Sequence, residues 1–109
     1  MKVVLLIRSD PRQSHRAAEG LRIALGLAIG GHQIDMILVG EARHLLDADI
    51  EHDREGEMIQ KFLLELRARV PAFYVWDTPA DTQPQAGVVF LSEREVAERV
   101  AAANRWIRF

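Results

Sequence analysis

Val3-Val4-Leu5-Leu6-Ile7, followed by Arg8-Ser9-Asp10-Pro11, is the stretch that decides the fold class. A short, unbroken apolar run rich in β-branched residues is typical of a strand buried on both faces, as in a parallel sheet. Ser9-Asp10-Pro11 predicts a helix start, because a capping side chain precedes a proline whose missing N–H costs nothing in the first turn. Apolar residues at helical spacing follow, and Gly30-Gly31 predicts the end of that helix.

The same alternation of strand and helix continues to the end of the chain. We expect further strands at Ile34–Val39, Phe73–Trp76, Val88–Leu91 and Trp106–Phe109, and further helices at about Asp53–Arg69 and after the capping box Ser92–Glu95. The segments Glu41–Asp53, with one short helical turn, and Asp77–Gln85 are expected loops. Alternating elements favour right-handed βαβ units. The sequence therefore predicts one α/β domain over residues 1–109, a three-layer sandwich with a mainly parallel sheet of about five strands flanked by helices.

Composition excludes several classes of protein. The 109 residues are 49% hydrophobic and 28% charged, which is globular, and the net charge of −2 argues against nucleic acid as a partner. The apolar runs are too short to cross a membrane or to form a signal peptide, so we expect a soluble cytoplasmic protein. The chain has no cysteine. Disulfides, thiolate nucleophiles, iron–sulfur clusters and persulfide chemistry are therefore excluded, and no cofactor is expected.

Two stretches carry a resemblance to a known family. The first runs from Arg8-Ser9-Asp10-Pro11 through Arg16-Ala17, Leu21 and Ile23-Ala24-Leu25 to Gly31-His32 and Ile34, and the second from Leu91–Val96 to Asn104–Phe109. In order and spacing they resemble DsrE/DsrF-like proteins, which include small subunits of sulfur-relay and dissimilatory sulfur-oxidation complexes, and Gly40 after the second strand also fits. The resemblance implies a DsrEFH-like fold for the full length of the chain.

The chain departs from that family at the end of the third strand. Catalytic members carry there a cysteine that passes on persulfide sulfur, whereas this chain has Trp76 and Asp77, and neither can hold sulfur. Family subunits without the thiol serve as partners within trimers or hexamers. The resemblance thus implies a non-catalytic homo-oligomer, a structural, docking or regulatory component linked to sulfur transfer or oxidation, with other DsrE-family or sulfur-carrier proteins as further partners. The alternative is a small-molecule or anion-binding module.

Candidate binding residues follow the strands, because parallel sheets bind ligands beyond their carboxyl ends. Amides at a helix start together with basic side chains suit an anion, although Ser9 and Asp10 can equally well only cap the helix. The candidates are Ser9, Asp10, Arg12, His15 and Arg16 after the first strand, and Trp76, Asp77 and Thr78 after the third.

Trp76 and Trp106 are candidate interface residues, since large aromatic side chains dominate interface energetics. For Trp76 a place in the core and a role as a stacking platform are also open.

Two further groups of polar residues lack the spacing or the surrounding sequence of a known functional motif. His44, Asp47, Asp49, Glu51, His52 and Asp53 are possible metal ligands, but their spacing matches no known metal motif, so no metal site is expected. Ser9 or Ser14 with His15 lacks a nucleophile elbow, so we predict no hydrolase and no catalytic residues.

Overall fold

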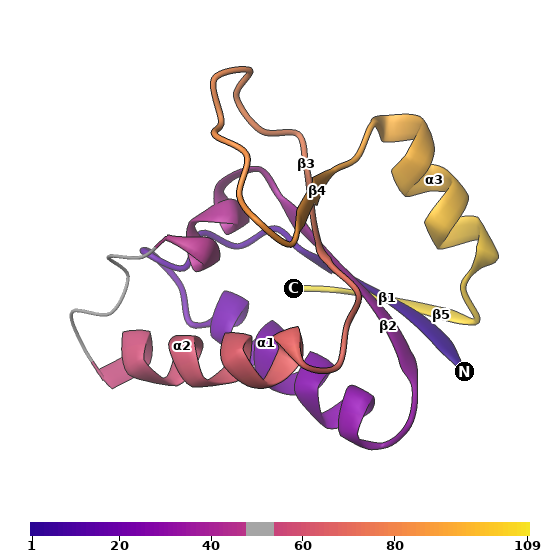
Figure 1. The fold of residues 1–109 in the computed structure, drawn as a ribbon, viewed down its shortest axis with the longest axis horizontal. Coiled ribbons are helices and arrows are strands. Elements are labelled where there is room, and N and C mark those ends of the chain that lie inside the picture. Colours follow the sequence, from indigo (N-terminus) through magenta and orange to yellow (C-terminus); the bar gives the residue numbers. More distant parts are fainter. Residues whose placement is uncertain (48–53) are drawn as a thin grey trace.

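A five-stranded, wholly parallel sheet forms the centre of the molecule in the computed structural model, which describes residues 1–47 and 54–109 (Figure 1). The strands are β1 (Lys2–Ile7), β2 (Gln33–Val39), β3 (Phe73–Trp76), β4 (Val88–Phe90) and β5 (Arg105–Arg108), in the order β4-β3-β2-β1-β5. Each neighbouring pair is parallel. The predicted single α/β domain with about five strands is confirmed.

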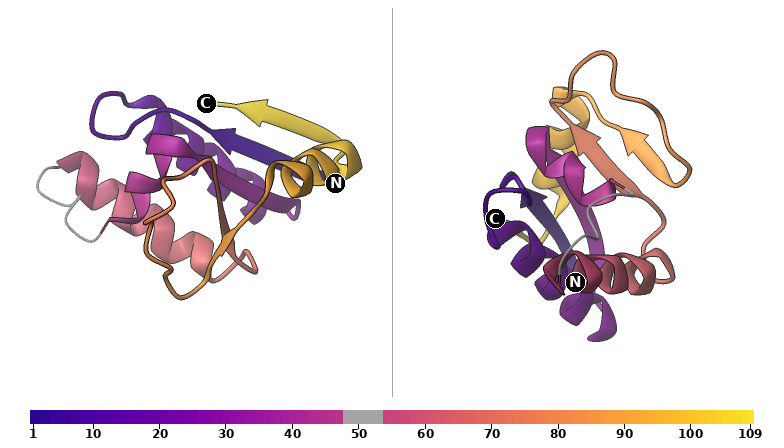
Figure 2. Two further views of the ribbon diagram at one scale, coloured as in Figure 1. Left: turned by 90° about the horizontal axis from the view of Figure 1, so that it is seen from above. Right: turned by 90° about the vertical axis from the view of Figure 1, so that its left-hand side faces the viewer.

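Helices cover the two faces of the sheet unequally. One face packs against α1 (Arg16–Ile29), α2 (Arg54–Arg67) and the 3-10 helix η1 (Gly40–Leu46), while the other packs against α3 (Glu93–Ala102). In Figures 1 and 2, α1 and α2 lie side by side beneath the sheet and α3 lies apart from them. One short helix cannot cover five strands. Part of the second face is therefore left open at the outer strands.

Residues of the central strands alternate between the two cores. In β1, Val3, Leu5 and Ile7 join the core beneath α1 and α2, and Val4 joins the core beneath α3. Both faces of this strand are thus apolar, which is why its sequence is an unbroken hydrophobic run. In contrast, the outer strands keep large apolar side chains in water: Val89 (43% exposed), Phe90 (45%), Trp106 (51%) and Ile107 (36%).

The start of α1 differs from the prediction. The helix begins at Arg16, and Ser9-Asp10-Pro11 does not cap it. The Asp10 carboxylate instead accepts a hydrogen bond from the backbone N–H of Arg12 at 2.9 Å, and the Asp10 carbonyl accepts from Gln13 and Ser14. These bonds form a separate turn ahead of the helix. An aspartate carboxylate accepts a hydrogen bond from the backbone N–H two residues further on as readily as it caps the start of a helix.

Other predicted helix signals are confirmed. At the end of α1, Gly31 has φ +90°, its N–H donates to Ala28, and the N–H of His32 donates to Leu27. This is a Schellman motif, which needs a left-handed residue. At the start of α3, the Ser92 hydroxyl accepts from the backbone N–H of Glu95 at 3.1 Å, and the Glu95 carboxylate accepts from that of Ser92 at 3.0 Å. Both halves of the capping box are present.

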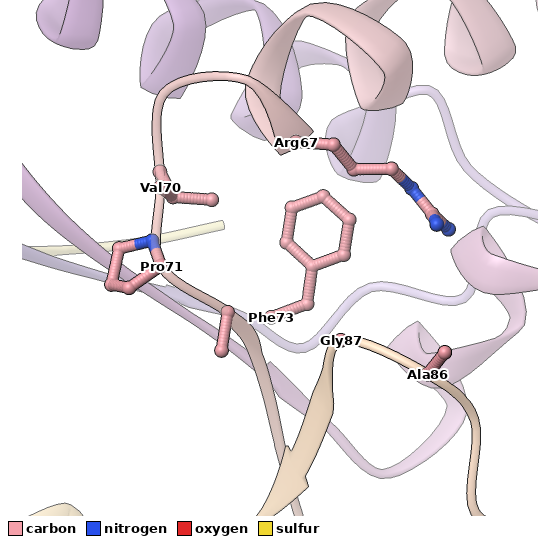
Figure 3. A pocket seen from close by; sticks show the side chains of 7 residues that line it. Arg67, Val70, Pro71, Phe73, Ala86 and Gly87 are labelled. Atoms are coloured by element: carbon pink, nitrogen blue, oxygen red, sulfur yellow. The ribbon is translucent and has the colours of Figure 1, made fainter.

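The connection after β2 is more ordered than the single helical turn predicted within Glu41–Asp53, since η1 extends over Gly40–Leu46. Residues 48–53 of that predicted loop lie outside the described residues, as does the predicted helix start at Asp53. The second helix ends at Arg67, and the chain then turns through Val70 and Pro71 into β3 (Figure 3). Strands β4 and β5 each end one residue earlier than predicted.

A buried charged residue lies in β2. Asp35 of β2 is only 3% exposed, and its carboxylate pairs with the Lys2 ammonium at 3.2 Å and the Arg99 guanidinium at 3.0 Å. The Arg99 guanidinium also stacks on the Tyr74 ring, 4.2 Å from its centroid. A buried carboxylate needs such partners to offset its desolvation. The pairing therefore ties α3 to β1, β2 and β3.

In the part of the chain that the structure describes, no helix has the length and apolar character required to cross a membrane.

Candidate functional site

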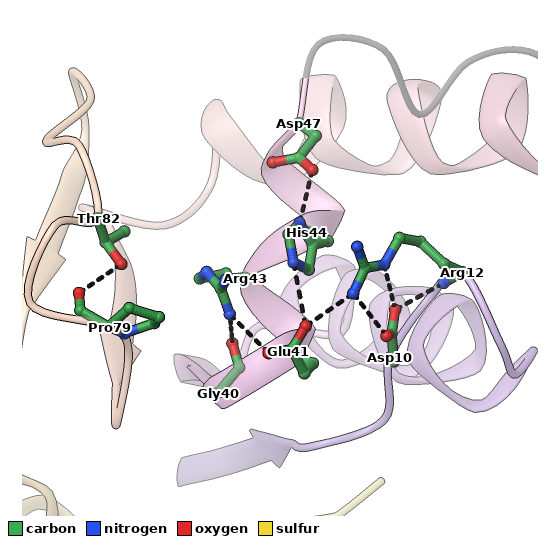
Figure 4. Close-up of polar contacts among 9 residues, drawn as sticks. All are labelled: Asp10, Arg12, Gly40, Glu41, Arg43, His44, Asp47, Pro79 and Thr82. Atoms are coloured by element: carbon green, nitrogen blue, oxygen red, sulfur yellow. Dashed lines mark hydrogen bonds and ion pairs between the residues drawn. The ribbon is translucent and has the colours of Figure 1, made fainter.

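Charged side chains from two loops meet at the carboxyl edge of the sheet (Figure 4). Arg12, in the loop after β1, donates through Nε and Nη2 to the two oxygens of Asp10 at 3.0 and 2.9 Å. The same Nη2 donates to Glu41 of η1 at 2.7 Å. Chiefly because of the side-chain hydrogen bond from Arg12, the pKa of Asp10 falls from 3.8 to about 2. Arg12 therefore joins the loop after β1 to the helix after β2.

Glu41 is the centre of this network. Besides Arg12, its carboxylate contacts Arg43 Nη1 at 3.2 Å and His44 Nε2 at 3.2 Å. The hydrogen bond from Arg43 is the main reason that the pKa of Glu41 lies below its ordinary value. The other His44 ring nitrogen, Nδ1, contacts Asp47 at 2.7 Å. The basic groups of the network thus already have acidic partners, which makes it a poor site for a free anion.

The ends of β2 and β3 touch at the same edge. Gly40 has φ +59°, and a Cβ added to it would lie 3.6 Å from the carbonyl oxygen of Asp77. Asp77 itself has φ +57°. No other non-glycine residue within residues 1–47 and 54–109 has a positive φ. Such left-handed backbone is strained for a residue with a side chain and often occurs at functional positions. The first residue after β3 is therefore held in an unusual conformation.

A cavity of about 310 Å³ lies between η1 and the loop after β3. Its walls combine a cation, two carboxylates and two side-chain amides with an aromatic ring from β4. The loop is braced by Thr82, whose hydroxyl donates to the Pro79 carbonyl at 2.7 Å (Figure 4). The lining residues are Arg43, Leu46, Asp47, Val75, Pro79, Asp81, Thr82, Gln83, Gln85, Val88 and Phe90. Mixed charges of this kind suit a neutral or zwitterionic polar molecule better than an anion.

Within residues 1–47 and 54–109, the predicted binding residues take part in several separate local contacts. In the first loop, Asp10 and Arg12 belong to the network around Glu41, and the backbone N–H of Ser9 donates to the Phe109 carbonyl at 3.3 Å. His15 is the N-cap residue of α1, and Arg16 is its exposed first residue, whose N–H donates to the Ser14 hydroxyl at 3.1 Å.

The residues after β3 also lie apart from the cavity. Trp76 is half-buried against the core beneath α3, Asp77 is exposed and Thr78 is half-buried, and none of the three lines the cavity. Trp106 is half exposed on the outer strand β5, with the Arg108 guanidinium 5.9 Å from its ring centroid.

Sequence reasoning missed several lining residues. Arg43 and Phe90 carry no local signal, because η1 and β4 border the same cavity only as a result of how the sheet packs. The loop containing Thr82 and Gln83 did have a signal, namely its length and its lack of periodicity.

The possible metal ligands are only partly described. His44 and Asp47 contact each other, whereas Asp49, Glu51, His52 and Asp53 lie outside the described residues. Among the residues that are described, no group of three or more acidic or histidine side chains is arranged to hold a metal ion.

Comparison with solved structures finds a protein of the same architecture. The crystal structure of the ychN protein from E. coli superimposes with a TM-score of 0.82 at 25% sequence identity, covering 100% of this chain and 99% of that one. The fold is of the DsrE/DsrF-like type. No protein-family model matches the chain, and no curated protein matches it. The resemblance inferred from the two ends of the sequence is therefore supported at the level of the fold.

Proposed function

We propose that this protein is a non-catalytic, oligomeric protein with the DsrE/DsrF-like fold that serves sulfur transfer or sulfur oxidation in the cytoplasm as a structural, docking or regulatory component. Its partners would be copies of itself, in a trimer or hexamer, and sulfur-carrier proteins. The full-length likeness in fold supports the general assignment. The absence of cysteine supports the non-catalytic role, because a persulfide needs a thiol to carry it.

The observation that carries the proposal is the exposure of apolar side chains on both outer strands. Val89 and Phe90 of β4 and Trp106 and Ile107 of β5 are each more than a third exposed. Unpaired sheet edges with apolar side chains are unfavourable in water and are usually covered by another chain. Trp106 is the strongest single candidate for a contact, since it presents the largest exposed ring.

Native mass spectrometry at low micromolar concentration tests the assembly. We expect an oligomer for the wild type, dissociation for Trp106→Glu, and no change for Leu64→Glu, a matched control on α2 where the leucine is 70% exposed. A wild-type species of only 12.3 kDa would remove the oligomeric part of the proposal. Uptake and release of sulfane sulfur by the purified protein alone would remove the non-catalytic part.

A second candidate function is the binding of a small polar molecule at the carboxyl edge. It is favoured by the cavity between η1 and the loop after β3, which places Arg43, Asp81 and Gln83 around one space. These groups supply hydrogen-bond donors and acceptors of both charges. The occupant would therefore be a zwitterion or a neutral polar compound rather than sulfate or phosphate.

Thermal-shift measurements with amino acids, nucleosides, sulfate and thiosulfate separate these ligand classes. Stabilisation by a zwitterion or a nucleoside that is lost in Gln83→Ala but kept in Arg16→Ala would support the cavity as the site, because Arg16 does not line it. Stabilisation by the anions alone, or equal loss in both variants, would count against it.

A further inference from the structure

We propose that a second cavity, at the amino edge of the sheet, is a binding site for a small aromatic carboxylate. This cavity has a volume of about 290 Å³ and lies between the end of α2, the entry to β3 and the turn before β4 (Figure 3). Its lining residues are Arg67, Val70, Pro71, Ala72, Phe73, Ala86 and Gly87. The two cavities share no lining residue, and this proposal does not depend on the one above. They are neighbours, because Ala86 and Gly87 lie in the chain between Gln85 and Val88, which line the cavity beside η1.

The walls of this cavity are mainly apolar, and two of the side chains that form them are held in place. Phe73 is 2% exposed and Val70 is 9% exposed, so both are anchored in the core beneath α1 and α2. The backbone N–H of Phe73 donates to the Gly87 carbonyl at 2.9 Å, and the N–H of Val70 donates to Leu66 at 2.9 Å. These bonds fix both sides of the opening. A preformed apolar cavity of this size fits a molecule with a single ring.

One positive charge stands at the cavity. The Arg67 guanidinium carbon lies 5.5 Å from the centroid of the Phe73 ring, and Figure 3 shows this side chain reaching along one side of the cavity. Arg67 forms no ion pair with any residue in the described ranges 1–47 and 54–109, and none of the lining residues is acidic. Its neighbour Arg69, in contrast, pairs with Glu65 at 3.5 Å.

The ligand class follows from this combination. A guanidinium held against an aromatic face keeps its N–H groups available, and its planar geometry matches a carboxylate with two parallel hydrogen bonds. The apolar walls select a hydrophobic body for the same molecule. A ring with a short carboxylate arm satisfies both requirements, whereas inorganic anions lack the apolar part and neutral aromatics lack the charge.

Phenylacetate is a suitable probe, and phenylacetamide is its neutral counterpart. In a two-dimensional 15N–1H NMR titration we expect shifts of the amides of residues 67, 70, 72, 73, 86 and 87, with a Kd on the order of 1 mM for so small a ligand. Arg67→Gln should weaken binding about tenfold or more, and Arg67→Lys should recover part of it because the charge remains. Arg69→Gln, two residues away, should bind as the wild type does.

The outcomes distinguish this site from non-specific contact. Saturable shifts confined to these residues, lost in Arg67→Gln and much weaker with phenylacetamide, would support the site. The inference is overturned by the absence of saturable shifts, by equal binding of phenylacetamide, or by equal weakening in Arg69→Gln. Arg67 and Arg69 are exposed, and the 15N–1H spectra of Arg67→Gln and Arg69→Gln also report directly whether each variant is folded.

Discussion

Two glycines of α1 provide a sharp test of how this helix packs on the sheet. Gly26 faces open space, with no atom within 4 Å of an added Cβ, whereas a Cβ at Gly20 would lie 2.8 Å from Ile7 Cδ1 and 3.2 Å from Phe109 Cγ. Replacing either by alanine gains about 0.5–1 kcal/mol of helix propensity. At Gly20 this gain is opposed by overpacking of about 1–3 kcal/mol, because the new methyl group would press on the fully buried Ile7.

The expected result is a difference of about 1–3 kcal/mol in the free energy of unfolding between the two variants. Gly26→Ala should be more stable than the wild type, and Gly20→Ala should be equal to it or less stable. Urea denaturation followed by circular dichroism measures this, with all variants at one protein concentration so that association contributes equally.

A double variant isolates the cause. Ile7→Val removes the Cδ1 atom that the new methyl group would meet, so Gly20→Ala should cost less in the Ile7→Val background, with a coupling energy of at least about 0.5 kcal/mol. If Gly20→Ala stabilises the protein as much as Gly26→Ala and shows no coupling to Ile7→Val, the close approach of α1 to β1 is refuted.

Three further predictions concern charges and caps. In urea denaturation, Asp35→Ala should lower the free energy of unfolding by about 2–4 kcal/mol. This is somewhat less than the loss on breaking a fully buried ion pair, because both cations can reach water. A loss no larger than that on breaking an exposed ion pair would contradict the anchoring of α3 by Asp35. Ser92→Ala should cost about 1 kcal/mol and Ser92→Asp much less, measured in the same way, since only the former removes the cap acceptor. The lowered pKa of Asp10, about 2 against 3.8, means that its contribution to stability is present above about pH 4 and is lost as the pH falls towards 2. A carboxyl 13C NMR titration of Arg12→Ala should show this pKa returning towards 3.8, and an unchanged pKa would exclude Arg12 as its cause.

Signals that lie within a few residues of each other were sufficient for most of the fold. The unbroken run Val3–Ile7 predicted a central parallel strand, Gly30-Gly31 predicted the end of α1, and Ser92 with Glu95 predicted the start of α3. These predictions succeeded because the hydrogen bonds and the periodicity involved are local. The amino-acid composition alone was also sufficient to show that the chain has no thiol.

Contacts between distant residues decided the rest. Asp10 looks like a helix cap in sequence, but in the structure its carboxylate binds Arg12, which also reaches Glu41, 29 residues further along the chain. The sequence alone gives no partner for Asp35, which interrupts an apolar strand. In the structure, α3 brings Arg99, 64 residues away in the chain, to the Asp35 carboxylate. Both cavities join segments that are separate in sequence, as Arg67 and Gly87 are at the amino edge. Periodicity specifies which residues form a strand or a helix, but only the register and packing of those elements determine which side chains meet.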